Sequence, residues 1–191
     1  QELIESVKSL KNIVLPVFYD YSAEQILTPL PELKTGSNGL GNVAVYPDSV
    51  ARRIASFVFN QEIHPHELYL PMAVELVRMY KEIPRKEVRI TFSELHLGSL
   101  GTFPLENSLL RINYQGPAGY FPRIPFQDIL HQNYQQNLTG KIILIGTFDP
   151  TLGGEASTPY GSEPNMPMYS TEIQAHLVQS LMERNPLKQV P

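Results

Sequence analysis

The polar residues best placed for chemistry follow an apolar run near the end of the chain. The run is "KIILIGT", residues 141–147, and the loop after it contains two adjacent glycines together with Asp149, Thr151, Thr158 and Tyr160. Adjacent glycines let backbone amides approach a ligand closely. In open α/β sheets, ligands bind in the crevice at the carboxyl ends of the strands. The loop is therefore a candidate for ligand binding, and a purely structural loop is the alternative.

Familiar catalytic motifs are missing from this loop and from the rest of the sequence. No Lys–Ser/Thr pair follows the glycines as in a Walker loop, and neither G-x-G-x-x-G nor G-x-S-x-G occurs. His64 and His66 lack a third residue at a metal-ligand spacing, so we interpret them as histidines of a solvated turn. We therefore expect no catalysis, no metal and no cofactor. An enzyme that uses the loop 148–160 is a third alternative, after sensing and a purely structural role.

Composition narrows the class of protein further. The chain has 191 residues, of which 42% are hydrophobic and 18% charged, which is typical of one folded domain with a core of its own. The net charge is −4 and no Lys/Arg cluster occurs, which argues against nucleic acid and anionic membrane surfaces as partners. The absence of cysteine excludes disulfides and thiolate chemistry. No apolar run approaches the roughly 20 residues of a membrane helix.

The apolar pattern predicts a mixed fold. Helices are predicted over 1–11, 70–84, 125–132 and 170–184. Strands are predicted over 12–19, 87–92, 108–116 and 141–148, with two more on either side of a turn at 47–49. The run 141–148 is continuously apolar, which is typical of a strand buried on both faces. We expect an α/β (mixed α+β) fold: a mixed sheet with hairpins, helices packed on it, and a C-terminal β–loop–α unit.

Three stretches, in order, resemble the type-2 CHASE domain, the second family of cyclase/histidine-kinase-associated sensory extracellular domains. They are "PDSVARRIASFVF", "LLRINYQGPAGYFPRIPFQDIL" and "LTGKIILIGTFDPTLGGEASTPYG", and the chain closes on a similar "STEIQAHLVQSLM". In this resemblance the Asn-Tyr-x-Gly-Pro element is Asn113–Pro117 and the Gly-Lys strand is 140–146. The Thr-Pro element is Thr158–Pro159, and the last helix starts at Glu172–Ile173. The family commonly has His next, where this chain has Gln174.

The resemblance implies an input domain for signalling. Such domains lie on the extracytoplasmic face of bacterial membrane proteins, periplasmic or at the cell surface, and are not catalytic themselves. Transmembrane helices join them to an adenylate or guanylate cyclase, a histidine kinase of a two-component system, or a Ser/Thr kinase. They begin with a strand and helix that have no counterpart here. We therefore expect a single sensory domain over 1–191 that lacks its N-terminal part and the membrane tether.

Two hypotheses about sites follow. An unidentified small molecule is expected at the carboxyl end of strand 141–147, and its candidate contacts are Asp149, Thr151, Thr158, Tyr160, Arg111 and Tyr114. The last helix is expected to pass on the signal from its start, at Glu172 and Gln174. The wide apolar side of this helix leaves two alternatives open. Either this apolar side covers the sheet within one chain, or it contacts a second copy in a homodimer, as part of a structural ectodomain that binds no small molecule.

Overall fold

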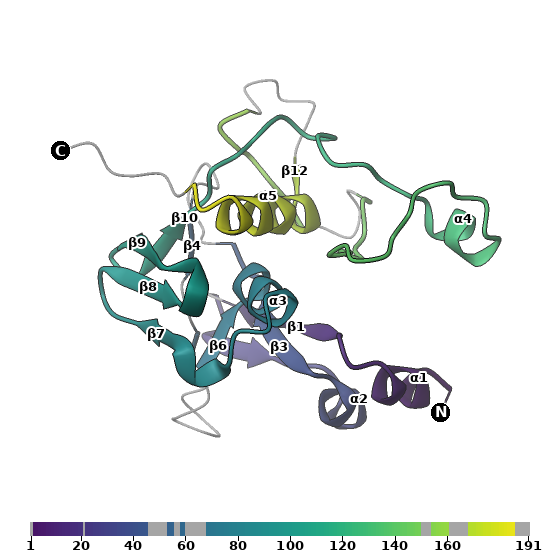
Figure 1. The fold of residues 1–191 in the computed structure, drawn as a ribbon, viewed down its shortest axis with the longest axis horizontal. Helices are drawn as coiled ribbons and strands as arrows, with labels where there is room; N and C mark the ends of the chain where they lie inside the picture. The colour runs from purple at the N-terminus through teal and green to yellow at the C-terminus, as the bar shows by residue number, and fades with distance from the viewer. Residues whose placement is uncertain are drawn as a thin grey trace.

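The computed structural model describes residues 2–20, 22–45, 53–55, 58–59, 68–149, 154–160 and 168–185. The helices in these ranges are α1 (Glu2–Ser9), α2 (Pro31–Gly36), α3 (Met72–Tyr80), α4 (Phe126–Leu130) and α5 (Ser170–Met182) (Figure 1). The strands are β1 (Val14–Asp20), β2 (Gln25–Leu27), β3 (Gly39–Asn42), β4 (Arg53–Ala55), β5 (Val58–Phe59), β6 (Leu68–Pro71), β7 (Val88–Ile90), β8 (Glu94–Leu97), β9 (Thr102–Glu106), β10 (Leu109–Arg111), β11 (Glu155–Ala156) and β12 (Met168–Tyr169).

The first sheet has parallel strands at its centre. Its order is β2-β1-β3-β6-β5, in which β1, β3 and β6 are parallel and the two outer strands antiparallel. Leu15 lies opposite Leu40, and Gly41 lies opposite Leu70. Gly41 also lies against the backbone of Met72, where α3 begins, so any side chain at this position would overlap the helix. This close approach fixes α3 on the sheet.

The second sheet is an antiparallel meander with the order β4-β10-β9-β8-β7. Its strands alternate between inward and outward side chains, as a sheet with one buried face does. Leu95 and Leu97 of β8 are fully buried, and Phe103 of β9 and Leu110 of β10 join them. The turn between β8 and β9 is closed by a hydrogen bond from Leu97 N to Gly101 O.

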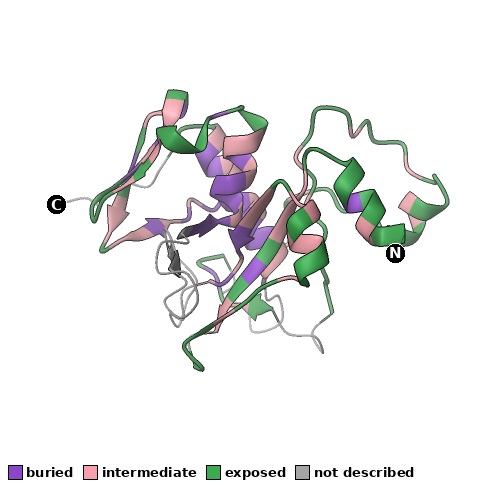
Figure 2. Ribbon diagram, turned by 90° about the horizontal axis from the view of Figure 1, so that it is seen from below, coloured by how far each residue is buried: buried purple, intermediate pink, exposed green. Residues whose placement is uncertain are grey.

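The core lies where α3 and α5 meet the two sheets. One cluster of buried side chains combines residues of both helices with both sheets: Leu70, Ala73, Val74, Val77, Ile83, Leu95, Leu97, Leu100, Phe103, Leu110, Leu177 and Leu181. Figure 2 shows the buried residues gathered in the middle of the molecule, while α1 is mostly exposed. A smaller cluster at the start of α5 contains Ile112, Tyr114, Met168 and Ile173.

The predicted fold class is confirmed: helices accompany sheets with both parallel and antiparallel strands. The predicted helix 170–184 is α5, and the predicted helix 70–84 is the shorter α3. No helix or strand is predicted over 93–107, but this segment contains β8 and β9. The turn at 47–49 lies outside the described residues. Within the described part of the chain, no helix is long and apolar enough to cross a membrane.

The predicted buried strand 141–148 is wrong, and with it the C-terminal β–loop–α unit. Residues 141–149 belong to no sheet, and Ile145 is 85% exposed. The reason lies in the neighbours of this segment, which are helices. The hydroxyl of Tyr80, at the end of α3, donates to Gly140 O at 3.0 Å, and Gly146 contacts Thr171 in the first turn of α5. A helix surface offers no backbone ladder, so the apolar run has no strand partner among the described residues.

Candidate functional site

The first turns of α5 carry three buried polar side chains, which is unusual for a helix that also fills the core. They are Glu172, Gln174 and His176, each at most 3% exposed. Glu172 and His176 are four residues apart and share one helix face, whereas Gln174 points to the opposite side. Burying such groups is costly unless each finds partners. Their partners therefore show what α5 is connected to.

Glu172 connects α5 to the loop 117–123. Its carboxylate accepts a hydrogen bond from Gly119 N at 2.7 Å and another from Arg123 Nη2 at 2.6 Å. The Arg123 guanidinium also lies 4.2 Å from the centre of the Phe148 ring. Phe148 in turn packs edge-on against Tyr169, immediately before α5. One carboxylate and one guanidinium thus hold together the loop 117–123, the end of the apolar run, and the start of the helix.

His176 lies one turn further along, within a shell of aromatic rings. The ring centroids of Tyr114, Tyr120 and Phe121 lie 5.1, 5.7 and 4.8 Å from its own. Its Nδ1 accepts a hydrogen bond from Gln115 N at 3.2 Å, which places the proton of the neutral imidazole on Nε2. Burial lowers the pKa of His176 to about 4, and the nearby Glu172 carboxylate opposes the shift. The ring is therefore neutral at pH 7.

Gln174 faces the first sheet and bridges two elements there. Its Oε1 accepts a hydrogen bond from Ala73 N at 3.2 Å, and its Nε2 donates to Val43 O at 3.4 Å. The amide thus connects the start of α3 with the residue that follows β3. Both ends of the side chain are used inside the fold, so Gln174 holds α5 to α3 and to the first sheet. Its predicted role in passing on the signal stays a prediction.

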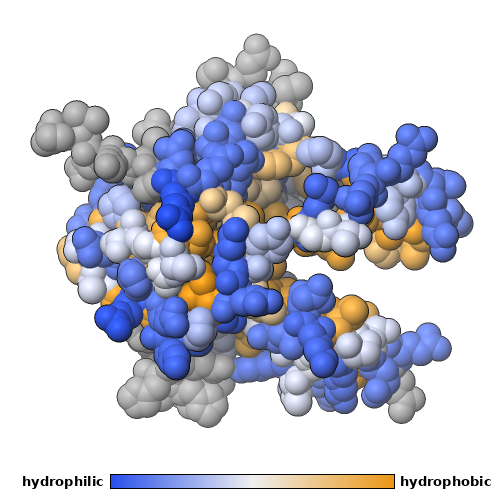
Figure 3. All heavy atoms as spheres, viewed as in Figure 1, coloured by the Kyte–Doolittle hydropathy of each residue, from blue (hydrophilic) through white to orange (hydrophobic). Residues whose placement is uncertain are grey.

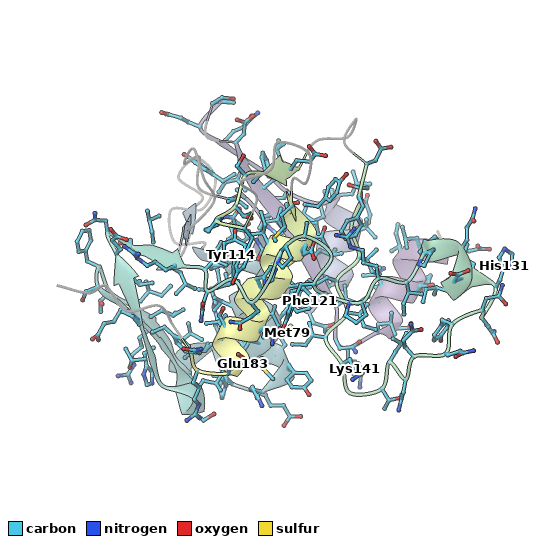
Figure 4. The ribbon with its side chains drawn as sticks, turned by 90° about the horizontal axis from the view of Figure 1, so that it is seen from above. Met79, Tyr114, Phe121, His131, Lys141 and Glu183 are labelled. Carbon is cyan, nitrogen blue, oxygen red and sulfur yellow. The ribbon has the colours of Figure 1, made fainter. Side chains whose placement is uncertain are left out.

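The segment 113–123 lies along much of α5, and Figure 4 shows Tyr114 and Phe121 beside that helix. At its start, Asn113 O accepts a hydrogen bond from Ser180 Oγ at 2.8 Å, and Asn113 Nδ2 donates to Asn185 O at 3.0 Å. At its end, Glu172 holds Gly119 and Arg123. A displacement of this segment would therefore change hydrogen bonds along α5 from its first turn to its last.

The structure places the candidate ligand residues in several different parts of the molecule. Tyr114 lies in the aromatic shell of His176, and burial raises the pKa of its hydroxyl. Thr158 is buried and Tyr160 half exposed, in the loop that meets α5 through the hydrogen bond from Ser170 N to Gly154 O at 2.7 Å. Asp149 is near Tyr169, whose pKa is raised by desolvation and further by Glu155 and Asp149. Thr151 lies outside the described residues.

Arg111 lies apart from this group. Its Nη2 and Nε lie 2.7 and 2.9 Å from Glu106 Oε2, within the second sheet. Sequence reasoning missed Arg123 and His176, which complete the cluster around α5. One signal could have found His176, which follows Glu172 at helical spacing, whereas no pattern in the sequence points to Arg123. Among the described residues, no group of three acidic, His or Cys side chains could hold a metal ion.

Comparison with known proteins identifies a family. The profile of the CHASE2 domain matches residues 1–191, the whole chain. No curated protein and no solved structure gives a significant match. The matched range includes both the segment 113–123 and the helix α5 that it holds. The chain therefore belongs to the CHASE2 domain family, an extracellular sensory domain family of signalling proteins.

Proposed function

We propose that this domain is the ligand-sensing input domain of a bacterial transmembrane signalling protein, on the extracytoplasmic side of the membrane. Its family membership and the missing catalytic motifs support a sensory role without catalysis. The output module of such a protein is an adenylate or guanylate cyclase, a histidine kinase or a Ser/Thr kinase. The ligand is a small molecule, bound where the loops around residues 117–123 and 148–160 meet α5.

The observation that carries this proposal is the pairing of buried Glu172 with Gly119 and Arg123. Arg123 is partly exposed, so a ligand can reach its guanidinium while that group holds the helix. A ligand that binds one arrangement of these loops better than another shifts the population of the two arrangements. Because Glu172 belongs to α5, the helix changes with the loops, by the small displacements of about 1–2 Å that signalling helices make.

A ligand screen tests the proposal. We expect at least one compound in a panel of small polar metabolites to raise the Tm of the domain in proportion to its concentration. A panel without such a compound would favour the second candidate, a dimerising ectodomain, which the exposed Ile143 and Ile145 support. Turnover of a hydrolase or phosphotransfer substrate that is lost on a single polar substitution would favour an enzyme instead.

The substitution Asp149→Ala is expected to weaken binding of such a compound at least about fivefold, while the Tm of the free domain changes little. Asp149 is exposed, lies near Tyr169 and belongs to neither core cluster, so its carboxylate is accessible to a ligand. Titration calorimetry of both proteins measures the effect. Arg111→Ala is the matched control, because Arg111 pairs with Glu106 away from α5. Equal affinity in the unsubstituted domain and Asp149→Ala would remove this loop from the site.

A further inference from the structure

Residues 141–149 form an extended segment with one side against the molecule and one side open. Ile142 and Leu144 are partly buried, and Ile142 packs against the main core cluster. Ile143 and Ile145, between and after them, are 53% and 85% exposed. This alternation with a period of two is that of a β-strand. Residues 141–145 thus alternate as the residues of a strand do, and residues 146–149, which are all exposed, continue the segment.

No backbone hydrogen bond joins residues 142–148 to another residue in the ranges that the structure describes. The segment lies in the arm that also carries α4, and Figure 4 shows Lys141 at the periphery of the molecule. Figure 3 shows hydrophobic residues along the side of this arm that borders an open gap. An exposed, apolar strand edge of this kind is a template for pairing with another strand.

The charges at the two ends of the segment indicate which strand fits. Lys141 and Asp149 have the same parity as Ile145, and they are equally far from it along the chain. In an antiparallel pair of two identical segments centred on Ile145, each Lys141 lies opposite the Asp149 of the other copy. Ile145 then lies opposite Ile145, and Ile143 opposite Thr147. Opposite charges directly across an antiparallel pair are favourable, whereas a parallel pair in register would place like charges together.

We propose that residues 141–149 are a dimerisation strand, which pairs antiparallel with the same segment of a second copy of this chain. The pairing supplies each strand with a hydrogen-bonded neighbour, which none of the described residues of its own molecule provides, and it covers the exposed Ile143 and Ile145 of both copies. One strand pair gives a small interface, so we expect a weak dimer, in the micromolar to millimolar range.

Sedimentation of the 1–191 chain over a range of concentrations provides the first test. The unsubstituted chain should associate, and Ile145→Asp should raise the dissociation constant at least about tenfold, because two carboxylates then meet at the centre of the pair. Phe92→Asp is the matched control, since Phe92 is exposed and apolar but lies in the turn between β7 and β8. A chain that stays monomeric at about 1 mM, or a Phe92→Asp effect as large as that of Ile145→Asp, overturns the proposal.

The register can be tested by cross-linking, because the chain has no cysteine of its own. Directly opposite residues of an antiparallel pair have Cα atoms about 4.5–5.5 Å apart, within the range that a disulfide spans. Ile145→Cys should therefore give a disulfide-linked dimer under mild oxidation, and Phe92→Cys should give much less. Equal cross-linking of the two variants indicates random collision and contradicts the register.

Exchange of the charges at residues 141 and 149 then distinguishes this antiparallel dimer from a dimer formed through another surface. Lys141→Glu alone and Asp149→Lys alone should each weaken association about threefold to tenfold, because both end pairs become repulsive. A mixture of the two single variants should recover association, since the introduced carboxylate of one copy then faces the introduced ammonium group of the other. The double variant should recover it as well. Single variants that associate like the unsubstituted chain, or a mixture without recovery, show that these residues do not face each other.

Discussion

Acidification from pH 7 to pH 4 is expected to cost the fold about 3 kcal/mol through His176 alone. The folded state lowers the pKa of this imidazole to about 4, whereas the unfolded chain restores the ordinary value near 6.5. Between these two values the unfolded state binds more protons than the folded state, so stability falls as the pH decreases through this window. Well above pH 6.5 the imidazole is neutral in both states and the effect vanishes. The cause is burial among Tyr114, Tyr120 and Phe121.

Denaturant unfolding at pH 7, 6, 5 and 4 measures this effect when the unsubstituted domain is compared with His176→Phe. The phenylalanine ring suits the aromatic surroundings and cannot titrate, so the variant should lose about 3 kcal/mol less than the unsubstituted domain over this range. Loss of the acceptor for Gln115 N affects the variant equally at each pH. Carboxylates elsewhere titrate in both proteins and cancel in the comparison. Parallel pH profiles would show that His176 is not held neutral by the fold.

Replacing Glu172 by alanine is expected to lower the free energy of unfolding by about 2 kcal/mol at pH 7. The substitution leaves the backbone N–H of Gly119 without its acceptor and Arg123 without its carboxylate. A hydrogen bond to a buried charged group contributes about 1.5–3 kcal/mol. Because Arg123 is partly exposed, water replaces some of its interaction, and the expected loss stays in the lower half of that range.

Urea unfolding measures this effect, with Glu183→Ala as the matched control on the same helix. Glu183 lies at the exposed end of α5, where it accepts a hydrogen bond from Gln179 Nε2. Loss of that surface contact should change the free energy of unfolding by less than about 0.5 kcal/mol. If both substitutions had the same effect, Glu172 would not hold the loop 117–123 to the helix.

Helix periodicity predicted α5 well because the apolar residues on the side that faces the core recur at helical spacing. Ile173, Leu177 and Leu181 recur every four residues, and all three are buried. The same logic predicted α3. The run 141–148 shows the limit of this reasoning, because apolar and β-branched residues favour an extended chain but do not specify a neighbouring strand. Here α3 and α5 occupy the space beside the run, and its second side stays exposed.

Sequence reasoning misses the hairpin of β8 and β9 for a related reason. Gly98, Gly101 and Pro104 make the segment 93–107 resemble a loop, although the two glycines lie at its turn and Pro104 lies within β9. At the candidate site, the importance of Glu172 could be predicted from its place at the helix start. Arg123, 49 residues away along the chain, could not, because a single sequence does not report which distant charges meet in the fold.

The measurement that tests the sensory account most directly is the output activity of the full-length signalling protein with Glu172→Gln, which keeps the size of the side chain but removes its charge. Glu183→Gln is the control at the other end of α5. The account predicts that Glu172→Gln changes the basal output or the response to stimulus at least about threefold, while Glu183→Gln behaves like the unsubstituted protein. Unchanged basal output and unchanged response in Glu172→Gln would contradict the claim that the start of α5 transmits the signal.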